Sequence, residues 1–214
     1  MDIVSLILLY ALPILLAVSL HEAAHGWIAH LLGDPTAKQL GRLTANPLKH
    51  IDPLGTVIVP LVMVLVVGFP FGWAKPVPVD VRNFVHPQKD MALVALAGPV
   101  SNLLMAIFWT MVLAIVLKVI PQGGFTAPLK VMAEVGVVIN LVLMVLNLLP
   151  VPPLDGGRIV TGVVPFKVAA FISRFEMIGM VVVIFLLASG FLGKILMPMV
   201  KAVQMNLYAM FGLG

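Results

Sequence analysis

An apolar run from Ile3 to Leu32 is long enough to cross a membrane as a helix, and His21-Glu22-Ala23-Ala24-His25 lies within it. On a helix the two histidines are about 40° apart around the axis, so both imidazoles face the same point. Ionisable side chains are expensive in hydrocarbon, at roughly 2.5–3.5 kcal/mol for each charged group, and are tolerated where they pair or bind a metal. The stretch therefore predicts a membrane helix that carries a polar or metal-binding site.

The H-E-x-x-H spacing has a specific chemical use. Two neutral imidazoles one turn apart can hold one zinc ion, and Glu22 can act as general base on a water bound to the metal. The pentapeptide alone also fits a second interpretation, in which His21 and His25 make polar interhelical contacts and Glu22 is an interfacial acid. The apolar surroundings favour zinc.

Composition fixes the solvent in which this chain folds. Of its 214 residues, 61% are hydrophobic and 10% are charged, with a mean hydropathy of +1.14, whereas soluble domains are about 25% charged. We expect an all-α polytopic membrane protein in which residues 1–214 form a single domain. The absence of cysteine excludes disulfides, cysteine–zinc ligation and thiol catalysis. The net charge is +4, but the basic residues lie in loops between apolar runs. This placement is typical of membrane topology and does not indicate a nucleic-acid partner.

The apolar runs predict five to six membrane segments. Full spans are expected at 3–32, 91–118, 131–149 and 167–190, and 193–211 is either a last span or an interfacial helix. The run at 56–67 is too short for a full span, and the two prolines of Trp73–Val79 suit an edge strand. Residues 56–80 are therefore expected to form a membrane-associated β-hairpin, or a short helix followed by a strand.

Prolines and glycines interrupt the chain after 131–149, in the sequence Asn147-Leu-Leu-Pro-Val-Pro-Pro-Leu-Asp155-Gly-Gly. Non-helical backbone at membrane depth is permitted only where it lines a site or is buried in protein. Asp155 suits the N-cap of the next helix. A catalytic zinc, however, needs three protein ligands plus water. Glu134 is expected at the far end of its helix and Glu176 lies beside Arg174, so Asp155 is the third ligand by elimination.

The sequence Ala97-Gly98-Pro99-Val100-Ser101-Asn102 begins the second span. From the residues alone, Gly98 and Ser101 allow close helix packing and Asn102 is expected to make an interhelical hydrogen bond. Together with HEAAH and N-x-x-P-x-P-P-L-D-G-G, this segment resembles the site-2 protease family of intramembrane zinc metalloproteases, in its small form without PDZ or CBS domains. The motifs match in order and spacing through residue 165. The resemblance implies a catalytic core over about 3–165, and the helices over about 167–213 are not diagnostic.

The resemblance also implies roles for individual residues. His21, His25 and Asp155 are expected to bind one zinc per chain, with Glu22 as the catalytic base. Asn147 is expected to contact the scissile peptide or its oxyanion. A β-element at Phe71–Val79 is expected to pair with an unwound substrate. The substrate-binding candidates are Asn102, Gly98, Phe71, Gly72 and Trp73.

The expected function is hydrolysis of peptide bonds within or near transmembrane segments, with a transmembrane protein or peptide as substrate and lipid as surroundings. A metal-binding membrane transporter is one alternative, but it would usually show internal repeats and more acidic residues and histidines on several helices. A catalytically silent membrane-bound regulator is another, but it would typically lack Glu22 or a ligand.

Topology follows from placing all motifs at one site. Residues 34 and 89 must then share a face, so the 56–67 run must enter the membrane and return. Basic residues predominate on the site's side, which predicts a cytoplasmic site in a bacterial or archaeal inner membrane. They are Lys38, Arg42, Lys49, Lys75, Arg82, Lys89, Arg158, Lys167 and Arg174, against Lys118 and Lys130 opposite.

Overall fold

The computed structural model describes residues 3–44, 46–49, 52, 55, 58–59, 75–121 and 123–213. Over these residues the secondary structure is helical and contains no strand, which confirms the predicted all-α class. The α-helices are α1 (Ile3–Leu31), α2 (Thr36–Gln39), α4 (Pro87–Lys118), α5 (Thr126–Asn147), α6 (Asp155–Val163), α7 (Phe166–Ser173), α8 (Glu176–Ala188) and α9 (Phe191–Met210). Two short 3-10 helices are η1 (Pro47–Lys49) and η3 (Val81–Asn83).

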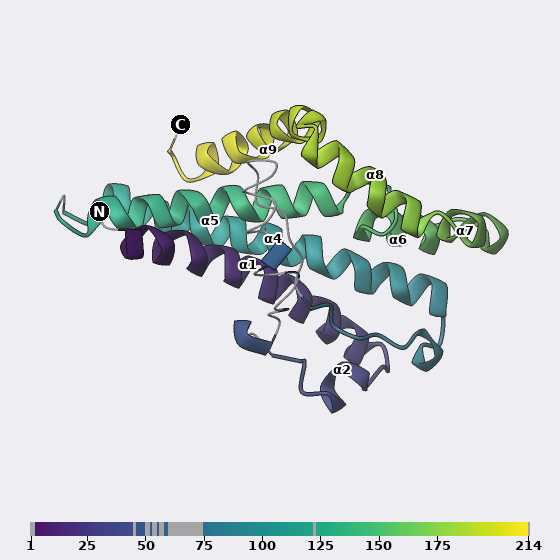
Figure 1. Ribbon diagram of the computed structural model, residues 1–214. Coiled ribbons are helices and arrows are strands. Elements are labelled where there is room, and N and C mark those ends of the chain that lie inside the picture. Colours follow the sequence, from purple (N-terminus) through teal and green to yellow (C-terminus); the bar gives the residue numbers. More distant parts are fainter. Residues whose placement is uncertain are drawn as a thin grey trace.

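The three long helices α1, α4 and α5 lie side by side and alternate in direction (Figure 1). Each contains a stretch long and apolar enough to cross a membrane, at Leu9–Leu31, Pro87–Lys118 and Thr126–Asn147. Three of the four predicted full spans, 3–32, 91–118 and 131–149, therefore correspond to these candidate spans, although α4 and α5 begin several residues earlier than expected. Pro87 and Pro128 lie in the first turns of these helices, where a missing N–H costs no intrahelical hydrogen bond.

The C-terminal region differs from the prediction. Instead of one helix over 167–190, α7 and α8 are separate and bent by 55° relative to each other. The described residues thus contain three candidate membrane spans, or four if the bent pair is one span. The predicted five to six membrane segments are not confirmed. Helix α9 is not among these candidates. It packs on α5, where Val200 joins Leu141 and Trp109 in the buried apolar core.

The predicted β-element is not confirmed. Phe71, Gly72 and Trp73 and most of the 56–67 run lie outside the described residues, and 75–80 is neither helix nor strand. Asp34, just after α1, accepts hydrogen bonds from the Asp80 N–H (2.8 Å) and the Asn83 amide (2.7 Å). The chain therefore returns by residue 80 to the end of α1, as the shared-site topology requires.

Candidate metal centre

Three side chains from two helices converge between α1, α4 and α6. The Nε2 atoms of His21 and His25 are 3.1 Å apart, and Asp155 Oδ2 is 3.2 Å from the first and 3.4 Å from the second. All three residues are buried. Zinc bonded tetrahedrally at about 2.0–2.1 Å places its ligand atoms about 3.3 Å apart. The spacing therefore fits a zinc ion.

Backbone geometry aims Asp155 at the histidines. The N-cap of α6 is Leu154, Asp155 is the first helical residue, and no side chain caps this end. The N-cap role considered for Asp155 is therefore not the one it has. Both following glycines are needed, because a Cβ on Gly156 would lie 2.3 Å from the Leu149 carbonyl oxygen, and one on Gly157 would lie 2.5 Å from Pro152 N. Helix α6 can pack on the preceding turn only without these side chains.

Hydrogen bonds on the far side of each imidazole set its tautomer. His21 Nδ1–H donates to Asn102 Oδ1 (2.6 Å), and His25 Nδ1–H donates to the Val94 carbonyl (2.7 Å). With Nδ1 protonated, each Nε2 presents a lone pair. These lone pairs meet Asp155 Oδ2, a buried oxygen that receives no hydrogen bond from any described residue. Lone pairs that converge in this way are suited to a cation, so the residues present fit zinc.

Glu22 lies beside this group but is not part of it. Its Oε2 accepts a hydrogen bond from the Val77 backbone N–H (2.9 Å), and the side chain is half-buried. The irregular segment 75–80 thus contacts α1 at Glu22. The second oxygen, Oε1, is not engaged by this contact.

Gly98 lies directly beside the two imidazoles. A Cβ at this position would be 2.4 Å from His21 Cε1 and 2.6 Å from His25 Cε1, so the close helix packing expected of this glycine brings α4 against the metal-ligand candidates. Asn102 is fully buried and makes the interhelical hydrogen bond expected from the residues alone. The substrate contacts implied for Gly98 and Asn102 remain predictions.

The other predicted site residues are less constrained. Asn147 is the last residue of α5, half-buried, and its amide makes no hydrogen bond to the described part of the chain. Its role in catalysis remains a prediction. The contacts of the Val94 carbonyl and the Val77 N–H could not be predicted, because backbone groups carry no residue-type signal. Asn140 lies on the predicted third span together with Asn147. Their spacing of seven residues places both side chains on one helix face.

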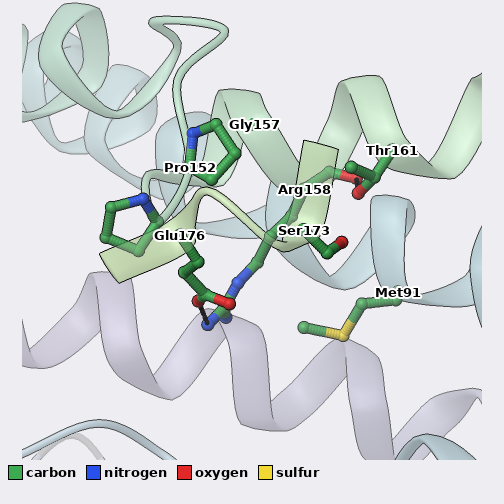
Figure 2. A pocket seen from close by; sticks show the side chains of 8 residues that line it. Met91, Pro152, Gly157, Arg158, Thr161, Ser173 and Glu176 are labelled. Atoms are coloured by element: carbon green, nitrogen blue, oxygen red, sulfur yellow. Dashed lines mark hydrogen bonds and ion pairs between the residues drawn. The ribbon is translucent and has the colours of Figure 1, made fainter. Parts of the chain in front are cut away.

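A separate cavity of about 230 Å³ lies beside α6 (Figure 2). Arg158 and Glu176 extend toward each other across it, with Arg158 Nη2 3.8 Å from Glu176 Oε1. Both side chains are about half exposed, so the ion pair contributes roughly 1 kcal/mol or less. None of the three metal-ligand candidates lines this cavity, which is bounded by residues of α4, α6, α7 and α8 and by Pro152 and Pro153.

Comparison with known proteins connects this geometry to an activity. Peptidase family M50 matches residues 118–190. YwhC of Bacillus subtilis, named as a zinc metalloprotease, is 39% identical over 202 residues, which cover 94% of this chain and 89% of YwhC. That coverage leaves too few unmatched residues to omit either His21 or Asp155.

Rip2 proteins, also named as zinc metalloproteases, match a shorter region. Rip2 of Mycolicibacterium smegmatis is 32% identical over 152 residues, and Rip2 of Mycobacterium tuberculosis strain H37Rv is 30% identical over 146 residues. Each match covers 66% of this chain and 52% of the relative. No solved structure matches the chain.

Proposed function

The chain belongs to peptidase family M50, the site-2 protease family, and we propose that it hydrolyses peptide bonds within or near transmembrane segments of membrane-protein substrates. The enzyme is a zinc metalloprotease and a multi-pass membrane protein. The observation that carries the proposal is the convergence of His21 Nε2 and His25 Nε2, on the candidate span α1, with Asp155 Oδ2 of α6 at one buried point. We assign these three residues as the zinc ligands.

Bound zinc supplies Lewis-acid activation of a water molecule and of the scissile carbonyl. Glu22 takes the proton of the attacking water at Oε1, the oxygen left free by Val77, and passes it to the leaving amine. Asn147 donates its amide N–H to the substrate carbonyl as negative charge develops there. His21 and His25 keep their Nε2 atoms directed at the site, because their Nδ1 protons are held by Asn102 and Val94.

A transmembrane substrate helix must unwind before its backbone can be cut, and its freed N–H and C=O groups then need partners. An extended segment at the mouth of the site can supply them by strand addition. Phe71, Gly72 and Trp73 are assigned to this role, and 75–80 already runs past Glu22. Gly98 and Asn102 complete the substrate-binding set.

The catalytic core is assigned to about 3–165 and the remaining helices to about 167–213, with five to six membrane segments in all. The site faces the cytoplasm, because the basic loops lie on its side of the membrane. Single substitutions Thr36→Cys, Gln88→Cys and Gly123→Cys test this orientation in a chain without cysteine. Only Gly123→Cys is expected to react with an impermeant thiol reagent in intact cells.

The function is tested with purified protein and a model transmembrane substrate. Glu22→Gln should abolish cleavage yet keep the zinc, because the base is not a ligand. Glu134→Gln is the matched control, since this half-exposed carboxylate pairs with Lys130 and with no other described residue, and it should leave cleavage unchanged. Full cleavage by Glu22→Gln would refute the proposal. Metal flux into liposomes that survives Glu22→Gln would identify a transporter instead.

A further inference from the structure

A chain of buried amides runs from the metal-ligand candidate His21 across α4 into α5. Asn102 Nδ2 donates to Asn140 Oδ1 (2.9 Å) and to the Ala17 carbonyl (3.3 Å). Asn140 Nδ2 donates in turn to the Gly136 carbonyl (2.8 Å). Both asparagines are 0% exposed, so water cannot replace these partners. Asn140 has no part in the function proposed above.

The hydrogen bonds between these amides can run in one direction only, because the last acceptor is a backbone carbonyl. The Gly136 oxygen can only accept, so the Asn140 amide nitrogen must face it and the Asn140 oxygen must face Asn102. Asn102 then presents its nitrogen to Asn140 and its oxygen to His21.

An acceptor at His21 Nδ1 requires the proton there and leaves the Nε2 lone pair toward Asp155. A reversed Asn102 amide would place its NH₂ against His21 Nδ1. It would favour the tautomer with the proton on Nε2, and that tautomer cannot bind a metal through Nε2. The direction of one amide group therefore decides whether His21 can act as a ligand.

We propose that Asn140 is a positioning residue for the metal site, which fixes the amide direction of Asn102 and through it the tautomer of His21. The inference rests on the zinc assignment made under the proposed function. Because the Ala17 carbonyl also restrains Asn102, loss of Asn140 weakens the site without destroying it. Mutation of a group that hydrogen-bonds to a metal ligand typically lowers metal affinity by about 10–100-fold. Because Ala17 also restrains Asn102, loss of Asn140 should lower the affinity by about tenfold.

The test measures the zinc dissociation constant of the full-length protein by competition with a chromogenic chelator. Asn140→Leu, which keeps the size but removes the acceptor, should bind zinc about tenfold more weakly than the wild type. Asn140→Asp should retain affinity, because a neutral carboxyl group can donate to Gly136 and accept from Asn102. Thr110→Val is the matched control, since Thr110 is equally buried on α4 but its hydroxyl bonds, within the described part of the chain, to the Ala106 carbonyl alone. It should bind zinc as the wild type does.

A second background separates positioning from general packing. In Asn102→Asp either carboxylate oxygen accepts from His21, so there is no amide direction to fix. Adding Asn140→Leu to Asn102→Asp should change the zinc dissociation constant by less than about twofold, whereas a packing role would weaken binding equally in both backgrounds. Thermal unfolding with chelator present verifies the fold, and Asn140→Val replaces Asn140→Leu if the latter does not fold.

Two results would overturn the inference: wild-type affinity in Asn140→Leu, or equal losses in the two backgrounds. In either case the proposed function would stand, because zinc would still bind. Failure of the wild-type protein itself to bind zinc would instead refute the metal assignment.

Discussion

Two buried carboxylates, Asp155 and Asp34, have opposite surroundings. Asp34 is 0% exposed and accepts four hydrogen bonds, from the Thr36 N–H and hydroxyl, the Asp80 N–H and the Asn83 amide. Asp155 is 7% exposed, and its Oδ2 faces two imidazole lone pairs and receives no hydrogen bond from any described residue. A buried carboxylate with a full set of donors holds the fold together, whereas one that faces lone pairs requires a cation.

Asp34 also acts on the site, but through the backbone. By holding Asp80 and Asn83 against the end of α1, it keeps the preceding residues beside Glu22, whose Oε2 accepts from the Val77 N–H. Burial alone would raise the pKa of Asp34, but its hydrogen bonds from Thr36, Asp80 and Asn83 outweigh burial and hold the pKa below the ordinary value. Asp155 thus faces the two histidines, whereas Asp34 holds the segment that contacts Glu22.

Asp155→Ala gives the largest expected effect and tests the cation requirement directly. Zinc content should fall from about one per chain to nearly none, and cleavage should disappear, because a catalytic zinc needs three protein ligands. Stability without metal should not fall, since the substitution removes a carboxylate that lacks donors. Metal analysis and thermal unfolding in chelator measure the two quantities. Wild-type zinc and activity in Asp155→Ala would show that Asp155 is not the third ligand.

Asp34→Ala should have the converse effect, with lower stability and retained zinc. Removal of the acceptor deprives the half-buried N–H groups of Thr36 and Asp80 and the exposed Asn83 amide of their partner, at a cost of about 1–3 kcal/mol in the free energy of unfolding. Denaturant titration of the purified protein measures the change. Asp80→Ala is the control, because the Asp80 side chain caps η3 and pairs with exposed Arg82 but makes no contact with Asp34, so its loss should lower stability less than Asp34→Ala does. Zinc loss with unchanged stability would reverse the assigned roles of the two carboxylates.

The sequence predicted one of these carboxylates and not the other. Asp155 was predicted as a zinc ligand because a catalytic zinc has three protein ligands, the H-E-x-x-H motif supplies two, and the chain has no cysteine to supply the third. The Asp34 contacts could not be predicted, because two of the four donors are backbone N–H groups and Asp80 and Asn83 lie far along the chain.

Helix prediction divided in the same way. The long spans follow from hydropathy, whereas the bend between Ser173 and Glu176 lies inside an apolar region whose composition does not encode direction. Asn102 and Asn140 both lie in predicted membrane spans, where an amide side chain needs a hydrogen-bond partner. That they pair with each other depends on how closely α4 and α5 pack. Gly136 sets that distance, because a Cβ there would lie 2.4 Å from the Trp109 ring.

Acid should remove the difference between wild-type protein and Asp34→Asn. The folded-state pKa of Asp34 is depressed, so its stabilisation is present above the unfolded value of about 3.9 and is lost as pH falls through the folded value. With chelator present, the melting temperature of the wild type should exceed that of Asp34→Asn at pH 6, and the gap should narrow below pH of about 4. A gap that stays constant down to strongly acidic pH would mean that the charge of Asp34 contributes nothing.

Val77→Pro gives the smallest expected effect and tests the connection from Asp34 to the base. The substitution removes the N–H that Glu22 accepts and replaces one buried side chain, in a segment already bounded by Pro76 and Pro78. Cleavage should slow by about twofold to tenfold, the equivalent of one hydrogen bond worth ~0.5–1.5 kcal/mol, while zinc content stays constant. Val79→Pro is the matched control, since Val79 also follows a proline and its N–H donates to no described residue. Equal slowing by both variants would show that proline alters the segment as a whole. If Val77→Pro alone slows cleavage, Asp34 at the end of α1 helps to orient Glu22, the proposed catalytic base. The connection then runs through residues 77–80.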